Sequence, residues 1–128
     1  MVGVHAAFTC EPATLDAVVG LSEDLDVGVH VHTAEGAVDA EPGLAFAKRA
    51  RSDWLLVHGV HLPDGVEIEG TIVHNPRSNM NNAVGRADIF ALGEAGVTVG
   101  IGTDGMTPDL RRDIMTGYLM HKHHVSDN

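Results

Sequence analysis

The chain has 128 residues, of which 44% are hydrophobic and 20% charged, a balance typical of one ordinary globular domain. Its formal net charge of -10 argues against a nucleic-acid backbone or an anionic membrane as the main partner. No stretch approaches the roughly 18 continuous apolar residues of a membrane span, and the N-terminus lacks the layout of a signal peptide. The single cysteine, Cys10, excludes an internal disulfide and a cysteine-cluster zinc site, so we expect a cytoplasmic protein.

Strands and helices are predicted to alternate along the chain. Short apolar runs predict strands at 2–6, 27–32, 54–59, 71–75 and 97–102. Helical periodicity predicts helices at 9–25, 41–51, 87–96 and about 108–120, and the histidines of the tail that follows (121–128) are interpreted as a solvated helix end. Strands that are apolar throughout and alternate with helices indicate parallel βαβ units. The predicted fold class is therefore α/β, either a barrel or an open doubly wound sheet.

Five polar residues fall at the carboxyl ends of the five predicted strands: His5, His32, His58, His74 and Asp104. In a (β/α)8 barrel this edge of the sheet carries the active site. Histidine is also the commonest metal ligand and titrates near neutral pH. The sequence therefore predicts a chemically active edge built from several strands.

The stretch "VGVHVHTAEG" (27–36) carries two histidines on one strand. His30 and His32 are two residues apart, so both side chains point to the same face. They either pack in the core or serve a metal, and His32 is the better ligand candidate because it is nearer the strand end. Glu35 follows just beyond the strand, where its carboxyl either reaches a bound water and a substrate or solvates the next helix.

The segment "HNPRSNMNNAVG" (74–85) is rich in amide and hydroxyl groups directly after a strand. Such groups either hydrogen-bond their own backbone in turns or line a polar substrate pocket.

The segment "GIGTDG" (100–105) matches G-x-G-x-x-G, the fingerprint of dinucleotide binding. Residues 106–108 separate it from the next predicted helix, and Asp104 would place a negative charge beside a pyrophosphate. Asp104 therefore fits a metal ligand and proton acceptor better, and a nucleotide-binding βαβ module is the weaker alternative.

Together, "GVHAAFT", "HVHTAEG", "LLVHGVHLPD", "VHNPRSNMNNAVG" and "GIGTDG" resemble the amidohydrolase superfamily in order and rough spacing. The sequence is most similar to the branch of cytosine and guanine deaminases and triazine chlorohydrolases. The resemblance covers essentially the whole chain and implies a partial metal-dependent (β/α)8 (TIM) barrel, approximately strands 4–8. Because a complete barrel needs about 250 residues, we expect residues 1–128 to form a single incomplete barrel domain. Strands 1–3 and the first-strand H-x-H metal motif would be absent from it.

The same resemblance implies roles for individual residues. His32 and Asp104 would bind one divalent metal, zinc or alternatively iron. Asp104 would also act as general base, Glu35 would shuttle a proton to the substrate, and His58 would orient the water or polarise the bond that breaks. The residues expected to contact substrate are His5, Asn75, Ser78 and Asn79.

The implied activity is hydrolysis of a non-peptide C–N bond, with deamination of a cyclic amidine or nucleobase-like substrate as the leading reaction. The implied partner is a small nitrogen heterocycle, and neither a nucleic acid nor a membrane is expected as a partner. Whether the chain forms a homo-oligomer is left open. The first alternative is a catalytically incomplete fragment without activity of its own. The second is the nucleotide-binding module read from residues 100–105.

Overall fold

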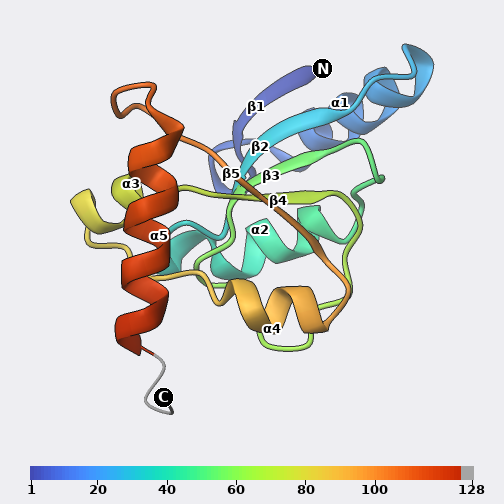
Figure 1. Ribbon diagram of the computed structural model, residues 1–128. Helices are drawn as coiled ribbons and strands as arrows, with labels where there is room; N and C mark the ends of the chain where they lie inside the picture. Colours follow the sequence, from blue (N-terminus) through green and yellow to red (C-terminus); the bar gives the residue numbers. More distant parts are fainter. Residues whose placement is uncertain (125–128) are drawn as a thin grey trace.

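The computed structural model describes residues 1–124, which form one five-stranded parallel sheet flanked by helices (Figure 1). The strands are β1 (Val2–Ala6), β2 (Val29–Thr33), β3 (Leu55–His58), β4 (Thr71–His74) and β5 (Thr98–Ile101). The helices are α1 (Pro12–Asp24), α2 (Ala40–Ala47), α3 (Pro76–Asn81), α4 (Ile89–Glu94) and α5 (Leu110–His124), with short 3-10 turns at Ala7–Thr9 and Ala37–Asp39.

The strands pair in simple chain order, β1-β2-β3-β4-β5, and every pair is parallel. A doubly wound sheet reverses its strand order at a switch point, whereas a (β/α)8 barrel adds each strand beside the previous one. The order therefore favours the barrel, and the five predicted strands and the α/β fold class are confirmed.

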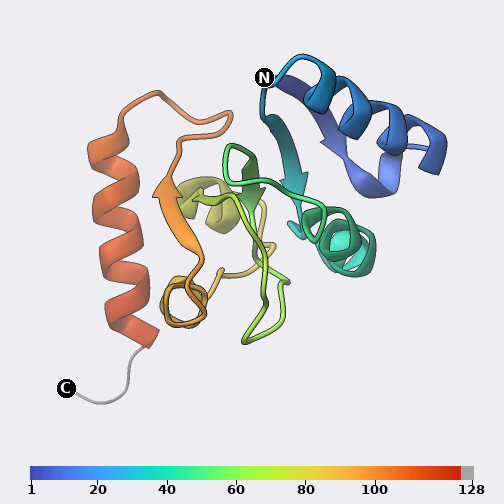
Figure 2. The same ribbon diagram turned by 90° about the vertical axis from the view of Figure 1, so that its right-hand side faces the viewer.

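One face of the sheet packs against the helices and forms the core. Val31 on β2, Leu56 on β3 and Ile72 on β4 all point to this face because side chains alternate along a strand. They pack with Phe46 of α2 and Leu92 of α4 in one buried cluster. Each such side chain contributes roughly 1.5–3 kcal/mol through removal from water. Helix α1 lies at the β1 end of the sheet and α5 at the β5 end (Figure 2).

The opposite face of the sheet carries histidines. His30 pairs in register with Gly3 of β1, and His32 follows it two residues later, so both point away from the helix-covered core. His5 and His30 are exposed and His32 is partly buried. In a barrel this face lines the interior, so the alternation of strand β2 accounts for two histidines in an otherwise apolar segment.

Helices α1, α2 and α4 are shorter than predicted, and α2 ends at Ala47. Two other elements differ further from the sequence prediction. No helix was predicted where α3 forms, because its serine and asparagines favour turns over helices. Pro76 at the first position starts this helix. Helix α5 continues past residue 120 to His124. The interpretation of its histidines as a solvated end is wrong for His121, which is only 4% exposed. The last part of the predicted tail, 125–128, lies outside the described residues.

His121 belongs to a buried chain of donors between α5 and the sheet. Arg86 can only donate, and its Nη1 lies 3.0 Å from His121 Nδ1, which therefore accepts. His121 Nε2–H then donates to His74 Nε2 at 3.3 Å. Burial, reinforced by the nearby His121 and Arg86, lowers the pKa of His74 to about 4. His74 is thus part of the packing beneath α5.

Among residues 1–124, no helix is both long enough and apolar enough to cross a membrane.

Candidate metal and catalytic site

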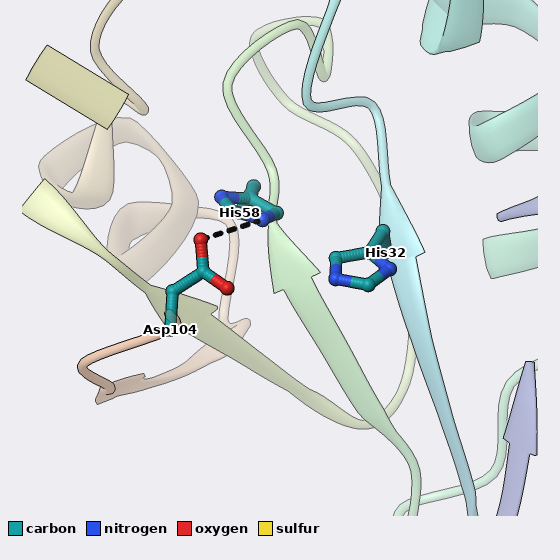
Figure 3. Close-up of side chains that lie close together, drawn as sticks. All are labelled: His32, His58 and Asp104. Carbon is teal, nitrogen blue, oxygen red and sulfur yellow. Dashed lines mark ion pairs between the residues drawn. The ribbon is translucent and has the colours of Figure 1, made fainter. Parts of the chain in front are cut away.

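Three potential metal ligands converge at the carboxyl edge of the sheet. His32 is the last residue but one of β2, His58 ends β3, and Asp104 lies in the loop after β5. One donor atom from each lies within 4.8 Å of the others. Figure 3 shows the Asp104 carboxylate and the His58 ring pointing toward one another, with His32 beside them. Residues far apart in the sequence therefore meet where parallel strands end.

An unusual backbone conformation places the His58 side chain. Strand alternation alone would put His58 on the same face as Leu56, inside the helix-covered core. Positive φ angles at His58 (79°) and Gly59 (66°) end the regular strand and redirect the ring. A bulky residue in this region carries strain of about 1–3 kcal/mol, which persists only where surrounding contacts hold it.

The hydrogen bonds of His58 fix its tautomer. Its Nδ1–H donates to the Oδ1 atom of Asn79 at 2.8 Å, so its Nε2 carries the free lone pair. This Nε2 is buried and has no hydrogen-bond partner among residues 1–124. It lies 3.5 Å from Glu35 Oε2 and 3.9 Å from Asp104 Oδ2.

His32 is oriented in the same way. Its Nδ1–H donates to the backbone carbonyl of His5 at 2.5 Å, which leaves Nε2 as the electron-pair donor. Its ring stacks on that of His58, with centroids 5.5 Å apart and an interplanar angle of 23°. Two imidazoles thus present lone pairs with a hydrogen bond behind each ring, as metal-binding histidines do.

Asp104 supplies the negative charge of the cluster. Its φ of 50° lies in the left-handed region, which aspartate tolerates better than most residues. Partial burial opposes its ionisation, but hydrogen bonds from Ser78 Oγ–H and the Gly105 backbone, together with His58 and His32, lower the pKa of Asp104 below its ordinary value. The side chain is therefore a carboxylate at neutral pH.

Glu35 sits in a turn that follows β2, with its carboxylate accepting from Asn82 Nδ2 at 3.4 Å. A buried residue that the sequence reading did not single out, Asp39, holds this turn: the Ala34 backbone N–H, at a left-handed φ of 50°, donates to Asp39 Oδ2 at 2.6 Å. Burial raises the pKa of Asp39, although backbone hydrogen bonds from Ala34, Glu35 and Phe8 partly offset this. No pattern in the sequence marks Asp39 for this role.

A pocket of about 310 Å³ opens beside Glu35 and His32, and its lining includes His5, Phe8, Val38 and Asn82. His5 lies on the wall of this pocket, and its contact with a substrate stays a prediction. Three other predicted substrate residues lie behind the cluster: Asn75 is 1% exposed, Ser78 4% and Asn79 0%. Ser78 contacts Asp104 and Asn79 contacts His58, so a direct substrate contact by these three residues stays a prediction.

The donor set fits a divalent metal. Two imidazole nitrogens and a carboxylate are ligands that zinc accepts readily, and iron uses similar sets. The His58 Nε2 atom is buried without a hydrogen-bond partner, as expected of an atom that faces a bound metal or substrate.

The "GIGTDG" segment has a packing role. Helix α5 begins only at Leu110, so no helix start directly follows the glycines. At Gly102 a Cβ atom would lie 2.4 Å from Asn75 Oδ1 and 2.7 Å from Val73 Cγ1. Gly102 is therefore needed for close packing against β4 and the segment that follows it, and the match to a dinucleotide fingerprint has a structural explanation.

Comparison with known proteins agrees with the fold. The sequence matches the profile described as the Amidohydrolase family over residues 1–128. It is 40% identical over 121 residues to the 5-methylthioadenosine/S-adenosylhomocysteine deaminase of Desulforudis audaxviator, covering 82% of this chain and 28% of that protein. The deaminase of the same name from Syntrophomonas wolfei is 33% identical over 146 residues, covering 98% of this chain and 34% of that protein.

Among solved structures, an adenosine deaminase from Xanthomonas campestris with bound zinc superposes with a TM-score of 0.80. It is 27% identical, and the match covers 94% of this chain and 32% of that one. The chain thus spans about a third of the length of the relatives it matches, and the partial-barrel prediction is confirmed. With a family profile matched along its whole length, the chain belongs to the amidohydrolase family.

Proposed function

We propose that the protein is a metal-dependent aminohydrolase, which replaces an amino group on a cyclic nitrogen-containing substrate by water and releases ammonia. The observation that carries the proposal is the convergence of His32, His58 and Asp104 within 4.8 Å, with the buried His58 Nε2 lacking a hydrogen-bond partner in the described chain. The relatives named as deaminases support the reaction class. We take the chain to correspond to strands 4–8 of the barrel.

In this proposal His32 and Asp104 are protein ligands of one metal ion, zinc in the first instance. When bound, the metal supplies acidity, because it lowers the pKa of a water molecule toward neutrality. Asp104 accepts the proton of the attacking water at its carboxylate, and the Ser78 hydrogen bond keeps that carboxylate ionised and in place.

Glu35 and His58 act on the substrate. Glu35 faces the 310 Å³ pocket, where its protonated form gives a proton to the ring nitrogen as water adds to the ring carbon. Glu35 then takes the proton of the new hydroxyl group, and the proton that Asp104 took from water passes to the amine, which leaves as ammonia. His58 Nε2 lies 3.5 Å from the Glu35 carboxylate and orients the attacking water toward the ring carbon. His5, on the pocket wall, contacts the heterocycle. The proposed substrate is therefore a small nitrogen heterocycle. We further propose that the enzyme is cytoplasmic.

The test is ammonia release from neutral purine and pyrimidine substrates after reconstitution with zinc or iron. It is measured on the 128-residue chain and on a version extended at its N-terminus by an H-x-H strand. We expect turnover in at least the extended version, and Asp104→Asn should abolish it while the circular dichroism spectrum is unchanged. Near-parent turnover by Asp104→Asn would refute the assignment. Activity confined to the extended version identifies the 128-residue chain as catalytically incomplete on its own.

A further inference from the structure

Helix α3 and the residue after it, Asn82, together contact the three candidate catalytic residues Glu35, His58 and Asp104. Ser78 Oγ–H donates to Asp104, Asn79 Oδ1 accepts from His58, and just beyond the helix Asn82 Nδ2 donates to Glu35. A displacement of this one short helix would therefore move all three groups together. What fixes α3 in place consequently matters for the site.

Arg77, adjacent to Ser78, ties α3 to α5. Its Nε and Nη2 both donate to Asp113 Oδ2, at 2.9 and 2.6 Å, and Nη2 also donates to the backbone carbonyl of Thr107 at 2.6 Å. Asp113 is 0% exposed, in the first turn of α5. The close approach of the two helices is completed by Gly117, where a Cβ would lie 3.5 Å from Pro76 Cγ.

The loop of residues 102–109 carries Asp104, and among the described residues its last member, Asp109, is held by Arg111 and Arg112 of α5. Nearer to Asp104 the loop has few attachments to other elements. Gly102 N–H donates to the His74 carbonyl at its start, and Ser78 holds Asp104 itself. Three residues after Asp104, Arg77 holds the Thr107 carbonyl. Asp104, Gly105, Thr107 and Pro108 are exposed, so side-chain packing does little to fix the loop.

From these contacts we infer that Arg77 is a positioning residue: its pairing with Asp113 and Thr107 holds the 102–109 loop so that the Asp104 carboxylate faces His32 and His58. Arg77 bonds to Asp113 and Thr107, not to His32, His58 or Asp104, and it acts through the loop and through Ser78. This inference rests on the proposed function for the identity of the site as a metal site. The statement that Arg77 orders the loop depends only on the contacts of Arg77 and not on the proposed function.

A single Arg77→Met change leaves Asp113 buried without its partner, which can prevent folding. The test therefore uses the double variant Arg77→Met/Asp113→Leu, since replacing both members of a buried ion pair by apolar residues is often neutral for stability. The matched control is Arg49→Met/Asp16→Leu, which removes an ion pair of 2.9 Å between α1 and the end of α2 on the exposed surface.

Two measurements are made on each protein: amide hydrogen exchange of 103–109 without metal, and Co²⁺ affinity with its visible absorption spectrum. In the Arg77/Asp113 variant we expect faster exchange confined to this loop, Co²⁺ binding weakened about 10–100-fold, and an altered cobalt spectrum. The control should match the parent. Arg77→Lys keeps the charge but not the fork of donors, so its loop exchange should fall between parent and double variant.

The outcomes separate the two levels of the inference. Loop exchange equal to that of the parent, in a folded double variant, overturns the positioning role. Faster loop exchange with unchanged Co²⁺ affinity and spectrum also overturns it, because Asp104 would then be placed without Arg77. If neither the 128-residue parent nor the version extended by the H-x-H strand binds Co²⁺, the proposed metal function fails, while the exchange measurement still decides whether Arg77 orders the loop.

Discussion

The buried His74 makes the stability of the chain depend on pH in a way that can be calculated. Its pKa falls from an ordinary 6.5 to about 4 in the folded state, because burial and the neighbouring His121, Arg86 and His58 disfavour the cation, only partly offset by Asp113. Protonation would also destroy its role as acceptor from His121 Nε2–H. Between these two pH values His74 is protonated in the unfolded chain and neutral in the folded chain.

This difference in protonation sets the direction and the size of the change in the free energy of unfolding with pH. The stability that comes from keeping His74 neutral is fully present above pH 6.5. It is lost progressively as the pH falls to about 4. Each pH unit in this interval corresponds to about 1.4 kcal/mol, so about 2 kcal/mol should be lost between pH 7 and about pH 5. The lowered pKa of His121 acts in the same direction. The raised pKa of Asp39 acts in the opposite direction, at the acidic end of the range.

The assay is urea unfolding of the metal-free chain at pH 7 and at about pH 5, for the parent and for His74→Gln. Glutamine retains an acceptor for His121 but does not titrate here, so about 2 kcal/mol of the pH dependence should disappear. His30→Gln, which removes an exposed imidazole, is the control and should leave the dependence intact. Equal losses of stability in the parent and in His74→Gln would show that His74 is not the buried neutral base described above.

Three further predictions concern the site and the core. Glu35→Gln should reduce ammonia release by about 10²–10⁴-fold with metal content unchanged, because an amide cannot transfer the proton; turnover near that of the parent would remove Glu35 from the mechanism. Leu56→Ala should lower the free energy of unfolding by about 2–5 kcal/mol because its side chain is fully buried, whereas Leu25→Ala, at an exposed position, should change it by about 0.5 kcal/mol or less. Gly102→Ala should cost roughly 1–3 kcal/mol in urea unfolding, since its Cβ would overlap Asn75; a parent-like variant would contradict the packing role of that glycine.

The fold was largely predictable from local patterns. Apolar runs such as 54–59 and 71–75 are too short and too rich in branched residues for helices, and they became β3 and β4. The choice between barrel and open sheet was not predictable from periodicity, because both folds alternate strands and helices. Strand order, a long-range property, decides it.

The site was predictable in part because strand ends converge in parallel sheets. His32, His58 and Asp104 could be grouped from their places after three apolar strands, and the structure brings them together. The supporting residues could not be found in the same way. The contact of Asn79 with His58 depends on helix α3, which was not predicted. Asp39 acts by accepting from the Ala34 backbone in a turn whose geometry the residue pattern does not predict.

The left-handed residues at the edge of the site have a consequence for protein engineering. Ala34, His58 and Asp104 adopt positive φ angles that glycine would occupy without strain. At these three positions glycine would relieve the backbone strain but would lose the side chain that the chain carries there. A selection for thermal stability alone would therefore drift toward glycine at the strand ends and lose the imidazole and the carboxylate first. Stabilising designs should hold these positions fixed and seek their gains elsewhere, such as on the exposed surface of α1.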